Sequence, residues 1–288
     1  MKDSKKSIFS DLTISLVSYK SEAQIKKLIN TLSQEISIIV IDNDQNLEFK
    51  NYLMNNFRNI KCLFPEENLG FGAGLNFAIK NTLTDYILHL DCDVKITNND
   101  IAKLITKAKN TPNFGVITPK LNNQKYDDLI ESYDEKNKMY KVSFNTGCAM
   151  LFKKSDVHEV GFFDENFFLY FEEHDYYKRC FNLGKPLYLY DDVIIEHIGH
   201  SSIREDSRYD YLICRNWHYC WSKFYYFKKH FNYFYAFKKT VPNLFSAIKN
   251  LLRFSFIGDF YKAKLYRAEF FGLMNSYLLR KSSYRMKK

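Results

Sequence analysis

The chain lacks the regular cysteine spacing of disulfide frameworks and zinc sites. Its six cysteines are scattered over 288 residues, and no two of them form a Cys-x-x-Cys pair. They are Cys62, Cys92, Cys148, Cys180, Cys214 and Cys220. Scattered cysteines without a Cys-x-x-Cys pair are typical of reduced thiols in a cytosolic protein, so we expect these in preference to a disulfide or zinc framework.

Long apolar runs are missing too. No stretch reaches the roughly 18 apolar residues of a membrane-spanning helix. The first apolar run, Thr13–Val17, is too short for the core of a signal peptide. The chain also has no internal repeat and no low-complexity linker. We therefore expect one or two globular domains and no spanning helix.

Acidic residues are scarce at the end of the chain. Trp221–Lys288 contains 15 Lys and Arg but only two acids, a local charge of +13, whereas the preceding 220 residues carry −4 of the total of +9. Aromatic residues are interleaved with the basic ones, as in Phe224–Phe231 and Arg253–Arg267. Lipid headgroups and simple helix packing explain this pattern equally well, and both explain it better than nucleic-acid binding.

Strand and helix patterns alternate through the first half of the chain. Strands are expected at Thr13–Tyr19, Ser37–Ile41, Ile60–Phe64, Tyr86–Leu90 and Gly115–Ile117. Helices are expected after an N-cap at Ser21 and at Leu47–Phe57, Gly72–Leu83 and Asn99–Lys109. This alternation predicts an α/β fold, a mostly parallel sheet with helices on both faces. Ligands of such sheets bind beyond the carboxyl ends of the strands.

The second half is less regular. Strands are expected at Phe144–Phe152 and Leu187–Ile195. A helix is expected at Glu172–Leu183 and should end at Gly184. After about Asp206 the pattern is helical and aromatic. We therefore expect a helical C-terminal region.

The most informative motif is Asp91-Cys92-Asp93, directly after an apolar run. Alternation along a strand would send Asp91 and Asp93 to one face. Two carboxylates at a strand end suit Mg²⁺ or Mn²⁺ beside a diphosphate, which is the chemistry of nucleotide-sugars. Solvated loops also contain such pairs, so the interpretation depends on the motifs around this one.

Two other strand exits carry candidate ligand groups. Asp42-Asn43 ends the second strand, where a carboxylate accepts a hydrogen bond from a base N–H or forms an ordinary Asx turn. The loop Asn68–Asn76 holds Gly70, Gly72 and Gly74 and opens a helix, which suits a phosphate. A dinucleotide fingerprint is excluded because its third glycine would fall at Leu75. A structural turn is the alternative.

Two later segments suit general-base and metal chemistry. Gly161–Asp175 mixes five carboxylates with aromatic rings, as a general base near neutral pH requires, although an acidic first helical turn would look similar. Ile194–Ser201 contains His197 and His200. One imidazole could complete a metal site with Asp93, or it could be an ordinary polar residue.

In this order the motifs resemble inverting family 2 glycosyltransferases with a GT-A fold, in particular the bacterial rhamnosyltransferase-like branch. The resemblance covers roughly residues 11 to 230. The motifs are Val17–Tyr19, Asp42-Asn43, Asn68–Asn76, Asp91–Asp93, Gly147–Leu151, Gly161–Asp175 and His197.

The resemblance implies a role for each matching position. Asp93 and His197 would bind Mg²⁺ or Mn²⁺. The base would be Glu173, with Glu172 as the alternative because this chain has Glu-Glu where the family has Glu-Asp or Asp-Asp. Positions implied to bind the nucleotide-diphosphate sugar donor are Val17, Ser18, Tyr19, Asp42, Asn68, Gly70, Gly72, Asn76 and Asp91.

The expected function is transfer of a hexose to a hydroxyl of a growing, lipid-linked surface polysaccharide, at the cytoplasmic face of the membrane. Rhamnose is one candidate, although the branch often has Asn-Pro-Asp where this chain has Asp91–Asp93. We expect a catalytic domain over residues 1–205, with a nucleotide-binding half at about 11–120 and an acceptor-binding half at about 121–205, and a helical region over 206–288 in peripheral membrane contact.

The sequence leaves two alternative functions, and it does not determine the oligomeric state. One is a sugar-phosphate nucleotidyltransferase, which usually has a basic loop near the first strand, where Val17–Glu22 offers only Lys20. The other is a catalytically silent binding or scaffold protein with the same fold. No nucleic-acid partner is expected.

Overall fold

The computed structural model describes residues 7–199 and 207–286, and its contacts divide the chain into two compact units. Unit 1 comprises Met1–Leu69, Ala73–Phe163 and Tyr176–Ile203, and unit 2 comprises Gly70–Gly72, Asp164–Asp175 and Arg204–Lys288. The domain boundary expected at residue 205 lies outside the described residues, so that division stays a prediction.

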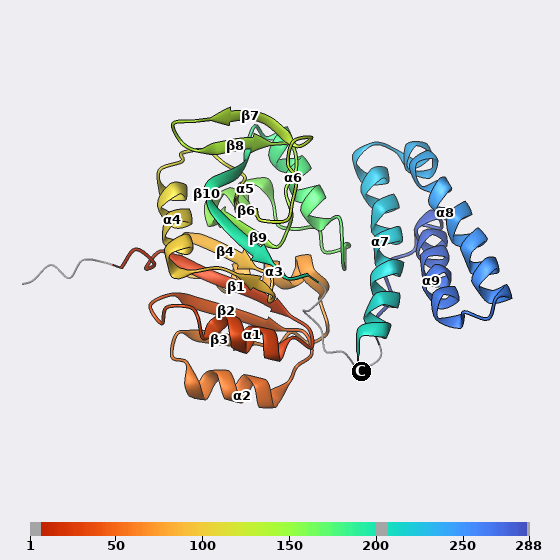
Figure 1. The fold of residues 1–288 in the computed structure, drawn as a ribbon, viewed down its shortest axis with the longest axis horizontal. Helices are drawn as coiled ribbons and strands as arrows, with labels where there is room; N and C mark the ends of the chain where they lie inside the picture. The colour runs from red at the N-terminus through yellow and green to blue at the C-terminus, as the bar shows by residue number, and fades with distance from the viewer. Residues whose placement is uncertain (1–6, 200–206, 287–288) are drawn as a thin grey trace, which may run out of the picture. The chain divides into compact units, whose positions relative to one another are not determined.

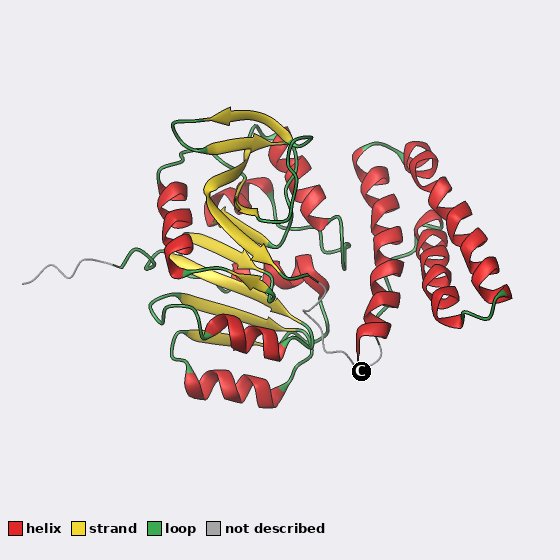
Figure 2. Cartoon of the chain, viewed as in Figure 1, coloured by secondary structure: helices red, strands yellow, loops and turns green. Residues whose placement is uncertain are grey.

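Unit 1 is built on one mixed sheet (Figures 1 and 2) with the order β3-β2-β1-β4-β9-β6-β10-β8-β7, while β5 pairs with β10 off this path. The strands are β1 (Leu12–Ser18), β2 (Ser37–Asp42), β3 (Ile60–Leu63), β4 (Tyr86–Leu90), β5 (Val94–Lys95), β6 (Val116–Leu121), β7 (Ile130–Asp134), β8 (Met139–Val142), β9 (Ala149–Lys153) and β10 (Leu187–His197). The four strands from β3 to β4 run parallel, as does the β6–β10 pair. The remaining pairs are antiparallel.

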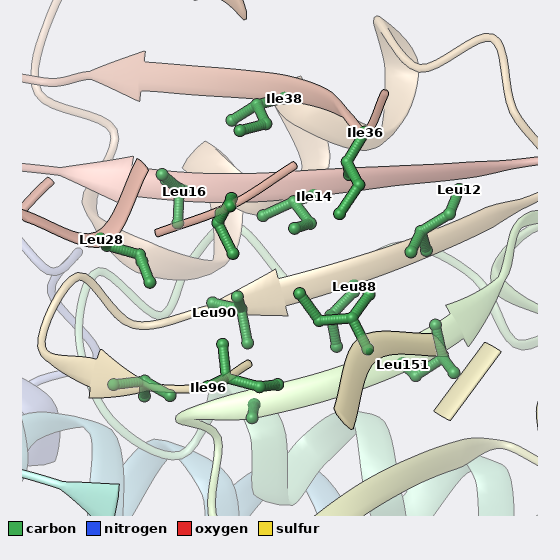
Figure 3. Close-up of a cluster of buried hydrophobic side chains, with 14 of the residues drawn as sticks. Leu12, Ile14, Leu16, Leu28, Ile36, Ile38, Leu88, Leu90, Ile96 and Leu151 are labelled. Carbon is green, nitrogen blue, oxygen red and sulfur yellow. The ribbon is translucent and has the colours of Figure 1, made fainter. Parts of the chain in front are cut away.

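Helices cover both faces of this sheet. They are α1 (Glu22–Ile29), α2 (Leu47–Asn56), α3 (Gly70–Lys80), α4 (Asn98–Lys109), α5 (Lys154–Val160) and α6 (Glu172–Asn182). On β2, Ile38 and Val40 join the core cluster that includes α1, α2 and α4 (Figure 3), whereas Ile39 and Ile41 pack with Ala78 of α3. This alternation confirms the predicted α/β sheet with helices on both faces.

Several elements differ from the sequence-based expectation. The strand expected at Phe144–Phe152 is confined to β9, because the Asn145 side chain donates to the Thr118 hydroxyl and accepts the Thr146 N–H, which competes with regular strand pairing here. The β7–β8 hairpin was not predicted. Ser21 occupies the N-cap position of α1, but its hydroxyl donates to the Tyr19 carbonyl instead of capping the helix.

Unit 2 contains the helices α7 (Arg208–His230), α8 (Tyr233–Phe256) and α9 (Phe260–Tyr277), which confirms the helical C-terminal region (Figure 1). Their core includes Phe224, Ala236 and Leu273. The helices α7 and α9 approach closely at Gly272, where an added Cβ would lie 2.2 Å from the carbonyl oxygen of Trp217.

Two further findings concern the whole described chain. All six cysteines are buried free thiols. Within residues 7–199 and 207–286, no helix combines the length and apolarity needed to cross a membrane.

Candidate functional site

Asp91 and Asp93 lie in the turn that links β4 to β5, and not on a strand as alternation had suggested. The Asp91 N–H donates to the Cys148 carbonyl at 2.8 Å, and the Val94 N–H donates back to the Asp91 carbonyl at 3.3 Å. The Cys92 thiol contacts the Val17 carbonyl at 3.5 Å, at the end of β1. These bonds fix the two carboxylates at the carboxyl ends of the central strands.

His197 reaches this turn because β10 pairs antiparallel with β5, with His197 opposite Val94. Its Nε2 lies 3.1 Å from Asp93 Oδ1 and 3.6 Å from Asp91 Oδ2. The bond to Asp93 raises the pKa of His197 above its ordinary value, against the opposing effect of burial. The structure therefore brings together the three side chains that were predicted near the metal. His200 lies outside the described residues.

The spacing of these groups fits a divalent ion. One donor atom from each of Asp91, Asp93 and His197 lies within 4.8 Å of the other two. Adjacent ligands of an octahedral ion, each at about 2.1 Å from the metal, are about 3 Å apart, which matches the Asp93–His197 separation. Carboxylates suit Mg²⁺ and Mn²⁺, and an imidazole suits first-row transition ions.

His89 is a further part of this cluster that the sequence analysis missed. It is fully buried on β4, with Nε2 3.3 Å from Asp91 Oδ1 and Nδ1 3.5 Å from Ser15 Oγ. It therefore links Asp91 to β1. A polar residue two positions before Asp91, within an otherwise apolar strand, was the available signal.

The ends of β1 and β2 form the neighbouring part of the site. Ser18 pairs in register with Asp42, and the Asn43 N–H donates to the Ser18 carbonyl at 2.9 Å. The Ser18 hydroxyl is buried and has no hydrogen-bond partner among the described residues. Because native proteins rarely leave a buried hydroxyl unpaired, this atom is a candidate for contact with a bound ligand.

Asp42 is also buried and already organises its own turn. Its two oxygens accept the N–H groups of Asp44 (3.3 Å) and Asn46 (2.9 Å). Burial raises its pKa to about 6, although these hydrogen bonds act in the opposite direction. The Asx-turn alternative therefore describes what the structure shows, and contact with a base stays a prediction.

The glycine-containing loop has clear structural roles. The Leu69 N–H donates to Asn43 Oδ1 at 3.0 Å, and a Cβ added at Gly74 would lie 2.8 Å from a Val17 methyl. The fully buried amide of Asn76 bonds the backbone N–H and carbonyl of Phe163, each at 2.9 Å. These contacts hold the loop near β1, while its predicted donor contacts stay untested.

Gly70 belongs to unit 2 and has φ +77°, a conformation that favours glycine. An added Cβ there would lie 2.1 Å from the Phe168 carbonyl oxygen, which also accepts the Phe71 N–H at 3.0 Å. This glycine therefore permits Gly70 and Phe71 to approach Phe168 closely within unit 2.

The acidic segment Asp164–Asp175 is held at both ends by α7. Asp164 accepts hydrogen bonds from Lys229 Nζ at 2.7 Å and from the Tyr225 hydroxyl at 3.1 Å. The fully buried Asp175 lies 2.6 Å from Lys229 Nζ and 2.9 Å from His230 Nε2. Burial would raise the pKa of Asp164, but Lys229 and the other donors outweigh it and hold that pKa below its ordinary value.

The two candidate bases differ in accessibility. Glu172 is buried, whereas the Glu173 side chain is 16% exposed and lies 3.3 Å from His174 Nδ1. The buried Oε2 of Glu173 has no hydrogen-bond partner within the described part of the chain. Just before them, Tyr170 and Phe171 have φ of 66° and 69°, each costing about 1–3 kcal/mol, and such strain is typical of functional segments.

The fold and the carboxylate–imidazole cluster define an α/β protein of the GT-A type. The sequence model of the family described as Glycosyl transferase family 2 matches residues 13–161, more than half of the chain, so the chain belongs to this family. It is 26% identical over 197 residues to the low-salt glycan biosynthesis hexosyltransferase Agl10 of Haloferax volcanii. That match covers 61% of this chain and 63%, less than two thirds, of the relative.

Solved structures share the fold. The mannosyltransferase PcManGT from Pyrobaculum calidifontis, in complex with GDP-Man and Mn²⁺, has a TM-score of 0.55 and 14% identity, over 92% of this chain and 86% of that one. S. aureus TarS 1-349 in complex with UDP-GlcNAc has a TM-score of 0.52 and 14% identity, over 94% and 92%. The expected fold and family are thus confirmed.

Replacing the unpaired Ser18 hydroxyl should have opposite effects on stability and binding. Ser18→Ala should raise the free energy of unfolding by about 1 kcal/mol, because a buried unpaired group is removed, and should weaken nucleotide binding by about fivefold. Urea unfolding and calorimetric titration measure the two effects. Ser222→Ala is the matched control: that buried hydroxyl donates to the Leu169 carbonyl at 2.9 Å, so its loss should destabilise. Destabilisation by Ser18→Ala with unchanged affinity would contradict the assignment.

The pKa of Asp42, about 6, predicts two opposed pH effects. The unfolded group titrates near 3.8, so the folded state binds more protons between about pH 4 and 6, and the contribution of Asp42 to stability falls as pH rises through this window. Nucleotide affinity should rise with pH through 6, because the ionised carboxylate is the better acceptor. Asp42→Asn should flatten both profiles and Asp44→Asn neither. An unchanged stability profile in Asp42→Asn would refute the shift.

Proposed function

We propose that this chain is a metal-dependent hexosyltransferase that moves one sugar from a nucleoside diphosphate to a hydroxyl group of a glycan, with inversion at the anomeric carbon. The cluster of Asp91, Asp93 and His197 at the strand ends carries the proposal. Membership of glycosyl transferase family 2 supports glycosyl transfer, and the match to a hexosyltransferase supports a hexose.

In the proposed reaction the acceptor oxygen attacks the anomeric carbon from the face opposite the diphosphate. The bond between that carbon and the diphosphate oxygen breaks, and the hydroxyl proton passes to Glu173. The partial exposure of the Glu173 side chain supports Glu173 over the buried Glu172. General-base assistance of this kind supplies roughly 10²–10⁴-fold in rate.

Asp93 and His197, with Asp91 beside them, would hold Mg²⁺ or Mn²⁺. When bound, such an ion stabilises the negative charge that develops on the leaving diphosphate. The Mn²⁺ and GDP-Man in the complex of PcManGT support a divalent ion with a nucleotide-sugar. Ser18 and Asp42 would bind the nucleoside, as the unpaired Ser18 hydroxyl suggests.

We also propose a sugar, an acceptor and a location for this reaction. Rhamnose or another hexose would be transferred to a lipid-linked, growing polysaccharide at the cytoplasmic face of the membrane. The role of the relative in glycan biosynthesis supports a glycan product, and six buried free thiols fit a reducing compartment. The basic and aromatic C-terminal region supports membrane contact.

Removal of the metal should abolish turnover, and Mg²⁺ or Mn²⁺ should restore it. Asp93→Asn removes a buried carboxylate from the cluster and should weaken Mn²⁺-supported nucleotide binding by tenfold or more, measured by calorimetry. Glu196→Gln is the matched control, because it removes one negative charge beside His197 from an exposed ion pair with Lys95. Full activity in excess chelator would rule out the proposed role of the cluster.

Replacement of the base should separate binding from chemistry. Glu173→Gln keeps the size of the side chain but cannot accept a proton, so nucleotide-sugar affinity should be retained while kcat falls by about 10²-fold or more. Glu172→Gln, the adjacent control, should lose far less. If Glu172→Gln is the inactive variant, the roles are exchanged, and if both stay active the acidic segment is structural.

A further inference from the structure

The helix α8 has an inner face that is fully used in packing. Ala236, Thr240 and Ala247 are buried there, and Ala236 joins the core around Leu273. The Thr240 hydroxyl lies 3.0 Å from that of Tyr277 on α9. Small residues occupy the buried positions of this face, and the partly buried Tyr233 and Leu244 pack against the same core.

The opposite face of α8 carries large apolar and basic side chains in alternation, which we call the α8 stripe. At about 100° per residue its members fall on one side of the helix, along about 33 Å of its length. They are Phe234, Lys238, Phe245, Lys249, Leu252 and Phe256. The apolar members are exposed to 84% (Phe234), 67% (Phe245), 66% (Leu252) and 93% (Phe256).

The stripe lies in a helix of one charge sign. α8 holds four basic residues and no Asp or Glu. Beyond its end the apolar surface continues with Ile257 and Phe260, which are also exposed, and Asp259 is already paired with Lys262 at 3.1 Å. A row of exposed rings on such a helix marks an interaction surface.

We propose that the α8 stripe docks on the surface of an anionic lipid bilayer, with the helix axis along the membrane plane. Phe245, Leu252 and Phe256 enter the boundary between headgroups and acyl chains, as in interfacial amphipathic helices. Lys238 and Lys249 lie between them, and their long stems let the ammonium groups reach lipid phosphates. The four basic residues of α8 favour a position at the membrane interface. They agree with the finding that no described helix is apolar enough to cross a membrane.

A second copy of the chain fits this face poorly. A symmetric pair would bring Lys238 and Lys249 of both copies into one apolar contact, and the stripe has no acid to neutralise them. An anionic bilayer supplies both the negative charge and the apolar layer that the stripe requires.

This inference rests on the proposed function only for membrane association, which it assigns to one helix face. Vesicle binding needs neither donor nor acceptor, so a chain that does not bind vesicles would contradict the docking surface but not sugar transfer. Conversely, an inactive enzyme that still binds vesicles would contradict sugar transfer but not the docking surface.

Insertion is tested by tryptophan fluorescence with vesicles of phosphatidylglycerol and phosphatidylcholine that carry brominated acyl chains. Both native tryptophans, Trp217 and Trp221, are buried. Emission from Phe245→Trp should shift to the blue and be quenched, whereas Phe181→Trp, a site on α6 with similar exposure (62% against 67%), should not respond. No quenching of Phe245→Trp, or equal quenching of both variants, would overturn the proposal.

Sedimentation with the same vesicles separates apolar from ionic binding. The double variant Phe245→Ser, Phe256→Ser should bind tenfold or more weakly at all salt concentrations. Lys238→Gln with Lys249→Gln should lose about tenfold at low salt and less at 0.5 M salt, because screening already removes that part. The control pair Lys125→Gln, Lys136→Gln changes exposed lysines of unit 1 and should bind as the native chain does. Circular dichroism verifies folding, and native-like binding by the serine variant would overturn the proposal.

Discussion

The site depends on one strand pairing, the antiparallel contact of β5 with β10 that sets His197 opposite Val94. This pair brings an imidazole from the end of a long strand to a turn more than 100 residues earlier, 3.1 Å from the buried carboxylate of Asp93. The negative charges of Asp91 and Asp93 lie so close together that they require a positive charge beside them. The bond to Asp93 raises the pKa of His197, which favours a protonated imidazole beside the two carboxylates, and a divalent ion would supply positive charge at the same place.

A second constraint acts in unit 2, where α7 holds the segment that carries the candidate base. Lys229 binds the first and last carboxylates of that segment, at Asp164 and Asp175, so the peptide between them is fixed at both ends. This anchoring explains how Tyr170 and Phe171 keep left-handed conformations that bulky residues avoid. It also gives some basic residues of the C-terminal region a structural role, while α8 leaves others at the surface.

The parts predicted from sequence were those set by local patterns. Apolar runs located the first four strands because buried parallel strands consist mostly of apolar residues, and the carboxylates at their ends followed from the rule that ligands bind at such edges. Asp91 and Asp93 do meet, although in a turn and not by alternation along a strand. The β5–β10 pairing, the link from His89 to Asp91 and the attachment of Asp175 to α7 were not predicted, because each joins residues by tertiary contact that no single segment encodes. The strand expected at Phe144–Phe152 likewise begins later than predicted, because the side chain of Asn145 competes for hydrogen bonds there.

The proposed sugar transfer depends on which groups bind beside Asp93. Crystals of the chain with MnCl₂ and a nucleoside diphosphate, measured at the manganese absorption edge, locate the ion directly. We expect one anomalous peak, from an ion that is coordinated by Asp93 and His197 and bridged to the diphosphate. This peak should be lost in His197→Asn. A peak held by other residues, or a diphosphate bound with no ion at this cluster, would contradict the account.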